Sequence, residues 1–312
     1  MKLALVTNAA AVPHARALHI ENLIAVAAPG AQCLRTSMPG DTVPLVRKAI
    51  AAGATRILIA GGDGTVHEAA NALIGTQAEL AVIPAGTGND YARSLGVPPG
   101  IDAAVEFALR TPALATDAGE LAYTGADGSA QRRVFVNIAE AGFGAHVVRY
   151  ARSTAKFAYP WLAYQLAILA ALATLRRAQV SVSVDGAPAR TVASSNLIVG
   201  IGQYFGGGMR PLPGALIDDG CFDVAHIRDA SRFEIARQAP MLRNGIDPDH
   251  PKVDQCRCRA LRAESAQAVP LEADGEWLGF LPASFTQLPG ALRVVRKPAP
   301  RRDHGAIEEA NR

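Results

Sequence analysis

The sequence has few cysteines, and no pattern that would cross-link them. Its 312 residues contain four, at Cys33, Cys221, Cys256 and Cys258, and none belongs to a CxxC pair. This spacing excludes a zinc ribbon and a disulfide framework, and it favours structural thiols in a reducing cytoplasm. Cys256 and Cys258 alternate with arginines, so we expect both thiols to point inward from one strand.

Excess charge of one sign is also missing. The formal net charge is only +3, and no long run of lysine and arginine is present. A nucleic-acid-binding protein concentrates basic charge on its surface, so the sequence gives no case for a nucleic-acid partner. A mildly basic surface is compatible with anionic lipid headgroups.

Three common catalytic motifs are absent. No GxxxxGK[ST] motif occurs, which excludes a P-loop protein, and no GxSxG motif marks a serine nucleophile. His67-Glu68 begins like the zinc motif HExxH, but Asn71 stands where the second histidine would be. The apolar run at the N-terminus stops at Thr7, short of the ~7–15 residues of a signal peptide core. We therefore expect a first β-strand there and a cytoplasmic protein.

The length suggests about two domains, and the first half has an alternating pattern. Short apolar segments alternate with helical periodicities, and continuous apolar strands between helices are typical of a parallel sheet covered on both faces. The sequence therefore predicts a doubly wound α/β nucleotide-binding domain over residues 1–120. The strands expected there are Leu3–Thr7, Arg56–Ala60 and Leu80–Pro84.

The pattern changes between residues 110 and 125. Short runs rich in valine, isoleucine, phenylalanine or cysteine follow, separated by Asp-Gly and glycine-rich turns, as in antiparallel hairpins. We predict a β-sandwich domain over residues 121–297 and a disordered tail over 298–312. The runs are Arg133–Ile138, Val180–Val184, Leu197–Ile201, Cys221–Ile227 and Gln255–Leu261.

A glycine loop lies between the second predicted strand and the most regular helix. Glycines allow backbone N–H groups to approach a ligand, and a helix N-terminus favours a phosphate. We expect Thr65 to be the N-cap of this helix, with Glu68 completing a capping box. A tight strand–helix connection without a ligand is the alternative. The loop consists of Gly61, Gly62, Asp63, Gly64 and Thr65.

A second glycine loop repeats this arrangement after the next strand. Loops at the carboxyl ends of neighbouring parallel strands face one crevice, and two phosphate-binding loops suit a nucleoside triphosphate. This loop contains Gly86, Thr87, Gly88 and Asn89.

These two segments resemble the diacylglycerol kinase catalytic family. Gly61–Leu73 (GGDGTVHEAANAL) and Pro84–Gly96 (PAGTGNDYARSLG) match its two motifs, and Asn137–Gly144, Gly206–Gly220 and Asp274–Glu276 follow in the family's order. The GGDGT pentapeptide is shared with NAD kinases, whereas the second motif is more selective for lipid kinases. The resemblance implies a nucleotide domain, a β-sandwich domain and an active site between them.

The resemblance also implies roles for single residues. ATP would contact Asn8, both glycine loops and Glu276, although the loop that begins at Asn8 lacks the proline and glycine usual in relatives. Glu276 would support the nucleotide or a metal. Asp274 would accept the proton of the lipid hydroxyl, while a plain hairpin turn is the alternative for this residue. Asp63 would position phosphates or a metal.

A structural magnesium ion is implied in the second half. The resemblance assigns it to the carboxylate of Asp219 with backbone carbonyls near Leu216 and Cys221. Carboxylates beside free carbonyls suit Mg²⁺, and a solvated turn is the alternative.

Phe157–Leu175 is a run of 19 residues without a charged side chain. Its length just reaches that of a membrane-spanning helix. A core or groove helix, a helix lying on the membrane surface and a spanning helix all remain open, in that order of preference.

The sequence as a whole predicts an ATP- and Mg²⁺-dependent kinase acting on the hydroxyl of a lipid such as diacylglycerol. Expected partners are the lipid and the inner face of the membrane, which the protein would contact peripherally. A homodimer is among the oligomeric states that the sequence permits. The alternatives are an NAD-kinase-like enzyme and a non-catalytic lipid-binding relative.

Overall fold

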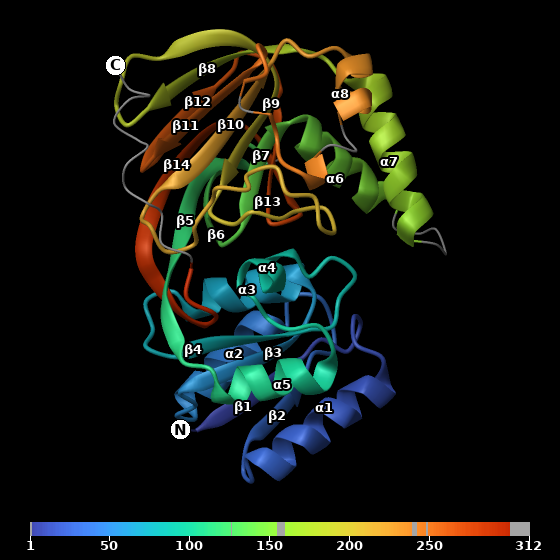
Figure 1. The fold of residues 1–312 in the computed structure, drawn as a ribbon, viewed down its shortest axis with the longest axis vertical. Helices are drawn as coiled ribbons and strands as arrows, with labels where there is room; N and C mark the ends of the chain where they lie inside the picture. Colours follow the sequence, from blue (N-terminus) through green and yellow to red (C-terminus); the bar gives the residue numbers. More distant parts are fainter. Residues whose placement is uncertain (1, 126, 155–159, 239–241, 248, 300–312) are drawn as a thin grey trace.

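The computed structural model describes residues 2–125, 127–154, 160–238, 242–247 and 249–299. Two lobes are stacked along the long axis of the molecule (Figure 1). The first lobe is mixed α/β and ends with helix α5, and the second is rich in β-strands. The mixed α/β class with a β-rich second half is therefore confirmed.

Four strands form the sheet of the first lobe. Their order is β2-β1-β3-β4, and each neighbouring pair is parallel. In β3 every side chain is buried, because both faces of the sheet are covered. The strands are β1 (Leu3–Thr7), β2 (Gln32–Arg35), β3 (Arg56–Gly61) and β4 (Glu79–Pro84).

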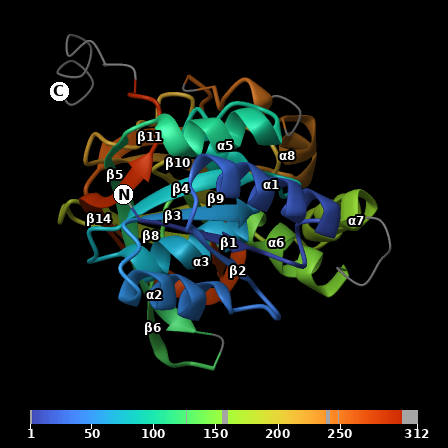
Figure 2. The ribbon, with the colours of Figure 1, turned by 90° about the horizontal axis from the view of Figure 1, so that it is seen from below.

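Helices cover both faces of these strands, as Figure 2 shows from below. Ala4 and Val6 of β1 belong to the core that includes α2 and α3, whereas Leu3 and Leu5 pack with α1 and α5. This division follows from the alternation of side chains along a strand. The helices are α1 (His14–Ala27), α2 (Thr42–Ala51), α3 (Asp63–Leu73), α4 (Asp90–Ser94) and α5 (Ile101–Arg110).

The second lobe is built from antiparallel strand pairs around Phe135, whose ring contacts those of Phe222 and Phe285. Three helices, α6 (Phe143–Thr154), α7 (Pro160–Thr174) and α8 (Arg232–Gln238), lie along one side of it (Figure 1). The strands are β5 (Ala113–Gly125), β6 (Ala130–Phe135), β7 (Ile138–Gly142), β8 (Ala178–Val184), β9 (Arg190–Gly200), β10 (Phe222–Arg228), β11 (Val253–Cys258), β12 (Ala260–Glu264), β13 (Pro270–Ala273) and β14 (Glu276–Val295).

Two long strands join the lobes, which corrects the expectation of a self-contained doubly wound sheet. β14 pairs with β5 along most of its length, and its last residues pair in parallel with β4. Figure 1 shows both strands running from one lobe to the other. The parallel strands are consequently continuous with the antiparallel ones in a single 14-stranded sheet.

Helix α7 begins at Pro160 and lies entirely within the apolar run at 157–175; residues 157–159 lie outside the described part of the chain. Among the residues that the structure describes, no helix is both long and apolar enough to cross a bilayer. Of the predicted tail, only Pro298 and Ala299 are described.

One expectation about the cysteines was wrong. Cys258 is buried but Cys256 is exposed. The two thiols share one face of β11, and this face is covered only where the strand ends.

Candidate active site

The first glycine loop connects β3 to α3. The helix begins at Asp63 with Gly62 as its N-cap, so the prediction of Thr65 as the N-cap was wrong. Thr65 lies in the first turn and is buried, and its Oγ1 accepts a hydrogen bond of 2.8 Å from Nδ2 of Asn8. A Cβ on Gly61 would lie 2.7 Å from that hydroxyl, so a glycine is required there. Asn8 and the first glycine loop are therefore in contact.

The second glycine loop closes on itself and lies against the first. Asn89 has a left-handed backbone, with φ of 56°; its side chain accepts from the N–H of Gly86 at 3.0 Å and donates to the carbonyl of Gly86 at 2.7 Å. A Cβ on Gly86 would lie 2.4 Å from the Cα of Gly62, and one on Gly88 would lie 2.7 Å from Oδ2 of Asp63. Both glycines are thus needed for the two loops to meet.

Asp63 links the loops electrostatically. Its Oδ1 accepts a hydrogen bond of 3.0 Å from the N–H of Tyr91, at the start of α4. Burial raises the pKa of Asp63, and the negative charges of Asp90 and Asp274 raise it further, while the hydrogen bond from Tyr91 opposes the shift. Perturbed carboxyl groups of this kind cluster at functional sites.

Asp274 lies in the turn between β13 and β14 and is almost completely enclosed, with 3% of its side chain exposed. Its φ is 51°, a left-handed conformation that Asp tolerates in turns. Oδ1 accepts from the N–H groups of Asn137 (2.9 Å) and Ile138 (3.2 Å), and Oδ2 from the N–H of Val136 (2.9 Å) and from Nδ1 of His67 (2.8 Å). A carboxylate offers about four lone-pair sites, and Asp274 uses all of them.

Glu276, two residues later, faces the first glycine loop instead. Its side chain is 40% exposed, and Oε1 lies 3.7 Å from where a Cβ on Gly64 would be. Nη1 of Arg152, on α6, lies 3.6 Å from Oε2 of Glu276 and donates to the carbonyl of Trp277 at 3.3 Å. Sequence reasoning missed Arg152 because no motif contains it; its only signal was its place at the basic end of an apolar run.

Two buried glutamates stand behind this turn. Glu140 of β7 and Glu272 of β13 are opposite each other across the two strands, and both are buried. Burial raises the pKa of Glu140 to about 7, against a hydrogen bond from Asn196. Burial and the charge of Glu140 raise the pKa of Glu272 well above its usual range, while the N–H of Gly275 opposes the shift. Two negative charges buried together repel each other, and this repulsion favours the protonated form of one carboxyl group.

Comparison with known proteins identifies the family. The model described as "Diacylglycerol kinase catalytic domain" matches residues 2–121, and that described as "YegS C-terminal NAD kinase beta sandwich-like domain" matches residues 137–296. The chain is 34% identical over 257 residues to "Probable lipid kinase YegS-like" of Pseudomonas fluorescens, which covers 82% of each chain. The chain belongs to the diacylglycerol kinase-like family of lipid kinases.

Further relatives are similar to this lipid kinase family member in sequence or in fold. A diacylglycerol kinase of Mycobacterium tuberculosis is 29% identical over 82% of this chain and 81% of its own length. The crystal structure of a diacylglycerol kinase from Bacillus anthracis aligns with a TM-score of 0.71 at 21% identity, covering 95% of this chain and 97% of that chain. Yeast NADH kinase complexed with NADH aligns with a TM-score of 0.52 at 11% identity, covering 94% and 82%. The two structures show a shared fold.

The expected metal residues of this family member are arranged differently from the prediction. Oδ1 of Asp219 accepts from the N–H of Cys221 at 3.2 Å, and Oδ2 contacts the guanidinium group of Arg257. Arg296 pairs with the neighbouring Asp218 at 2.7 Å. A guanidinium already neutralises each carboxylate. This arrangement does not fit a magnesium ion at Asp219, Leu216 and Cys221.

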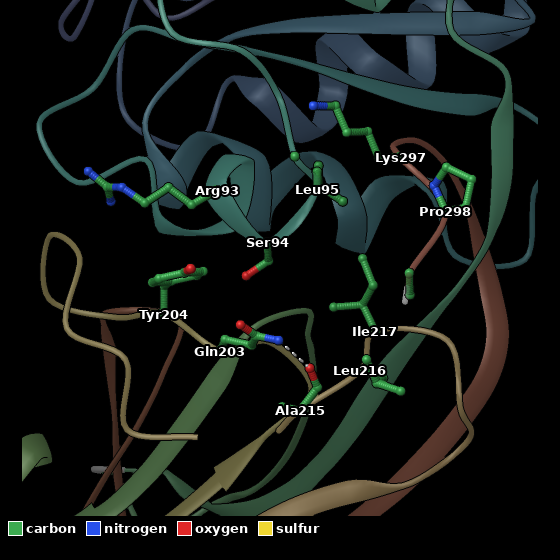
Figure 3. A pocket seen from close by; sticks show the side chains of 12 residues that line it. Arg93, Ser94, Leu95, Gln203, Tyr204, Ala215, Leu216, Ile217, Lys297 and Pro298 are labelled. Atoms are coloured by element: carbon green, nitrogen blue, oxygen red, sulfur yellow. Dashed lines mark hydrogen bonds between the residues drawn. The ribbon is translucent and has the colours of Figure 1, made fainter. Parts of the chain in front are cut away.

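A hollow between the lobes borders α4 (Figure 3). Arg93 and Ser94 line it from the first lobe, and Gln203 and Tyr204 line it from the second. The guanidinium of Arg93 donates to the carbonyl of Gly88 at 2.5 Å. One wall of the hollow is therefore tied to the second glycine loop.

Proposed function

We propose that this chain transfers the γ-phosphate of ATP to the hydroxyl group of a lipid, with diacylglycerol as the representative substrate. One observation carries the proposal: the carboxylate of Glu276, from the second lobe, lies over Gly64 in the first glycine loop. A phosphate donor on that loop and an alcohol acceptor from the second lobe would meet there. The family's relatives named as diacylglycerol kinases support the substrate class.

The two glycine loops would hold the nucleotide. Gly61–Thr65 brings the N-terminus of α3 to the cleft, where unpaired N–H groups and the helix dipole favour a phosphate. The contact between Gly62 and Gly86 puts the second loop at the same position. Asn8 supports the site through Thr65, and the nucleotide would arrive as its magnesium complex.

Glu276 is the better placed proton acceptor in this conformation. Asp274, to which the sequence assigned this role, is 3% exposed and uses its lone pairs on four hydrogen bonds, whereas Glu276 is 40% exposed in the cleft. A general base must come within hydrogen-bond reach of the proton that it takes. The lipid oxygen would lose its proton to Glu276 and form a bond to the γ-phosphorus, while the bond from that phosphorus to the β–γ bridging oxygen breaks and ADP leaves.

Asp63 and Asp274 would then act through position. Asp63 joins the first glycine loop (called the phosphate loop below) to the start of α4. This contact fits the role of orienting phosphates or their metal. Asp274 fixes the turn that carries Glu276. Positioning and electrostatic stabilisation account for most of the catalysis of phosphoryl transfer.

Helix α7 supports peripheral contact with a membrane. Its buried residues, Ala167 and Ala171, are small, and they pack against Val147 of α6. Two of its leucines face outward: Leu166 is 40% exposed and Leu169 is 61% exposed. This reverses the usual distribution on a surface helix, where large apolar side chains face the core.

Basic and aromatic groups continue this face. Arg176 and Arg177 follow the end of α7 and are exposed, and Phe233 of α8, which packs against α7, is 75% exposed. Leucines beside arginines suit a bilayer with anionic headgroups. We propose that α7 and α8 lie on the inner face of the cytoplasmic membrane, with residues 1–120 forming the nucleotide domain and 121–297 the lipid domain.

The test is transfer of labelled phosphate from ATP to a panel of lipids and to NAD. Wild type, Asp274→Asn and Glu276→Gln are compared with Asp127→Asn, which alters an exposed Asp-Gly turn. We expect label in one lipid class, and a loss of about 10²-fold or more in kcat for Glu276→Gln. Label in NAD alone would show that the substrate is a dinucleotide and not a lipid. ATP binding without transfer would indicate a non-catalytic relative. If Glu276→Gln has an unchanged kcat and Asp274→Asn is inactive, Asp274 and not Glu276 is the proton acceptor.

A further inference from the structure

A buried histidine joins the two lobes at the Asp274–Glu276 turn. His67 lies on α3, four residues after Asp63, and 1% of its side chain is exposed. Its Nδ1 lies 2.8 Å from Oδ2 of Asp274, and its Nε2 lies 2.9 Å from Nε of Arg133 on β6. Arginine can only donate hydrogen bonds. Nε2 is therefore the acceptor, and Nδ1 carries the proton that is donated to Asp274.

We propose that His67 is a positioning residue that holds the Asp274–Glu276 turn over the phosphate loop. The other three donors to Asp274 are backbone groups of residues 136–138, in the second lobe. His67 supplies the donor that comes from the helix of the phosphate loop. This inference rests on the proposed function, because it gives the position of Glu276 a catalytic meaning.

The next turn of α3 makes a second contact with the second lobe through Asn71, whose Nδ2 also lies 3.4 Å from Nε2 of His67. The side chain of Asn71 donates to the carbonyl of Val134 at 2.9 Å and accepts from its N–H at 3.1 Å. Asn71 thus binds α3 to β6 with a pair of hydrogen bonds to one backbone residue, as a neighbouring strand does. His67 fastens the same helix to the turn that carries Glu276, where a displacement of about 1 Å is enough to cost ~10²-fold in rate.

The experiment tests the hydrogen bonds of the two imidazole nitrogens separately. His67→Asn keeps a donor near the place of Nδ1, His67→Gln keeps an acceptor near the place of Nε2, and His67→Ala keeps neither. His19→Ala is the matched control, since it removes an exposed histidine that pairs with Asp102 at 2.6 Å away from the cleft. Measured quantities are kcat for lipid phosphorylation, the KM values for ATP and lipid, and Tm.

For His67→Ala we expect kcat to fall about 10- to 100-fold, with the KM for ATP within about threefold of wild type. His67→Asn should recover most of the loss, His67→Gln little of it, and His19→Ala should match wild type. Equal activity of the Asn and Gln variants would overturn the proposal. A fall in activity that only follows Tm, without rescue by Asn, would also overturn it.

A second readout needs no activity. In the wild-type protein, ¹⁵N NMR of the His67 ring should show the Nδ1–H tautomer, and His67→Ala should speed amide exchange in the Asp274–Glu276 turn at least about tenfold relative to wild type. If wild type labels no lipid, the proposed function fails while these two measurements still decide the inference. An Nε2–H tautomer, or unchanged exchange in His67→Ala, would refute it.

Discussion

The buried pair Glu140 and Glu272 should make the stability of the protein fall as pH rises, and Glu140→Gln should remove much of this dependence. The folded-state pKa of Glu140 is about 7, above its ordinary value of 4.5. The folded protein therefore holds a proton that the unfolded chain releases first. Its contribution to stability is complete below pH 4.5 and is lost as pH rises through about 7.

The size of the effect follows from this shift. A rise from 4.5 to about 7 corresponds to about 3 kcal/mol at ~1.4 kcal/mol per pH unit. Glutamine at this position has nearly the same shape, and its carbonyl can still accept the 2.7 Å hydrogen bond from Nδ2 of Asn196. Glu140→Gln should therefore have nearly the stability of wild type at pH 5 and exceed it by up to about 3 kcal/mol at pH 8.

Urea denaturation at several pH values between 5 and 8 measures this difference. Glu106→Gln is the control, because Glu106 is an exposed residue of α5 that pairs with Arg110. The control should follow the wild-type curve throughout. If Glu140→Gln and wild type lose stability in parallel from pH 5 to pH 8, Glu140 is charged in the folded protein across this range, and the reasoning is refuted.

Two further predictions concern the metal and the membrane. Because Arg257 already neutralises Asp219, removing Mg²⁺ with a chelator should change the Tm of the nucleotide-free protein by less than about 1 °C; a larger fall that Mg²⁺ reverses would restore the predicted metal site. Replacing both Leu166 and Leu169 with glutamate should weaken binding to phosphatidylglycerol-containing vesicles, measured by co-sedimentation, about tenfold or more. Val26→Glu, at an 85% exposed position on α1, should bind like wild type, and equal binding by all three proteins would exclude α7 as the contact.

The first lobe was predictable because its elements carry local signals. Three strands were expected within one residue of their bounds, since each is a continuous apolar run that ends in glycine, proline or a polar residue. The lobe junction was not predictable in this way. Nothing in the composition of β14 indicates that its first half pairs in the second lobe while Arg293 and Val294 pair with β4. Pairing between residues far apart in the chain leaves no local pattern.

In the second half, contacts between distant residues also determine where a single strand ends. Arg133–Ile138 was expected as one strand, but the strand is interrupted after Phe135, and β7 begins at Ile138. The interruption turns the N–H groups of Val136 and Asn137 toward Asp274. The apolar pattern continues through this break, because the residues on both sides of it are buried. A partner 137 residues away determines the break.

The motifs pointed to the candidate site, while the roles proposed within it depend on contacts that spacing does not record. The sequence brought forward Asp63, Asp274 and Glu276, but it could not distinguish an enclosed carboxylate from an exposed one. His67 entered the sequence analysis only as half of a zinc motif, and its partner is 207 residues away.

The charges of the cleft bear on how the proposed nucleotide would bind there. The pKa of Asp63 is raised by burial and by the charges of Asp90 and Asp274, so further negative charge at the first glycine loop is opposed by carboxylates already present. The phosphate groups of ATP would add such charge beside Glu276, whose Oε2 lies 3.6 Å from Nη1 of Arg152. Arg152 alone would not balance a triphosphate and these acids, and a divalent cation carried by the nucleotide would supply the missing positive charge. We therefore expect Mg²⁺ to act at the phosphates, and Arg257 and Arg296 to perform the structural task at the Asp218–Asp219 turn.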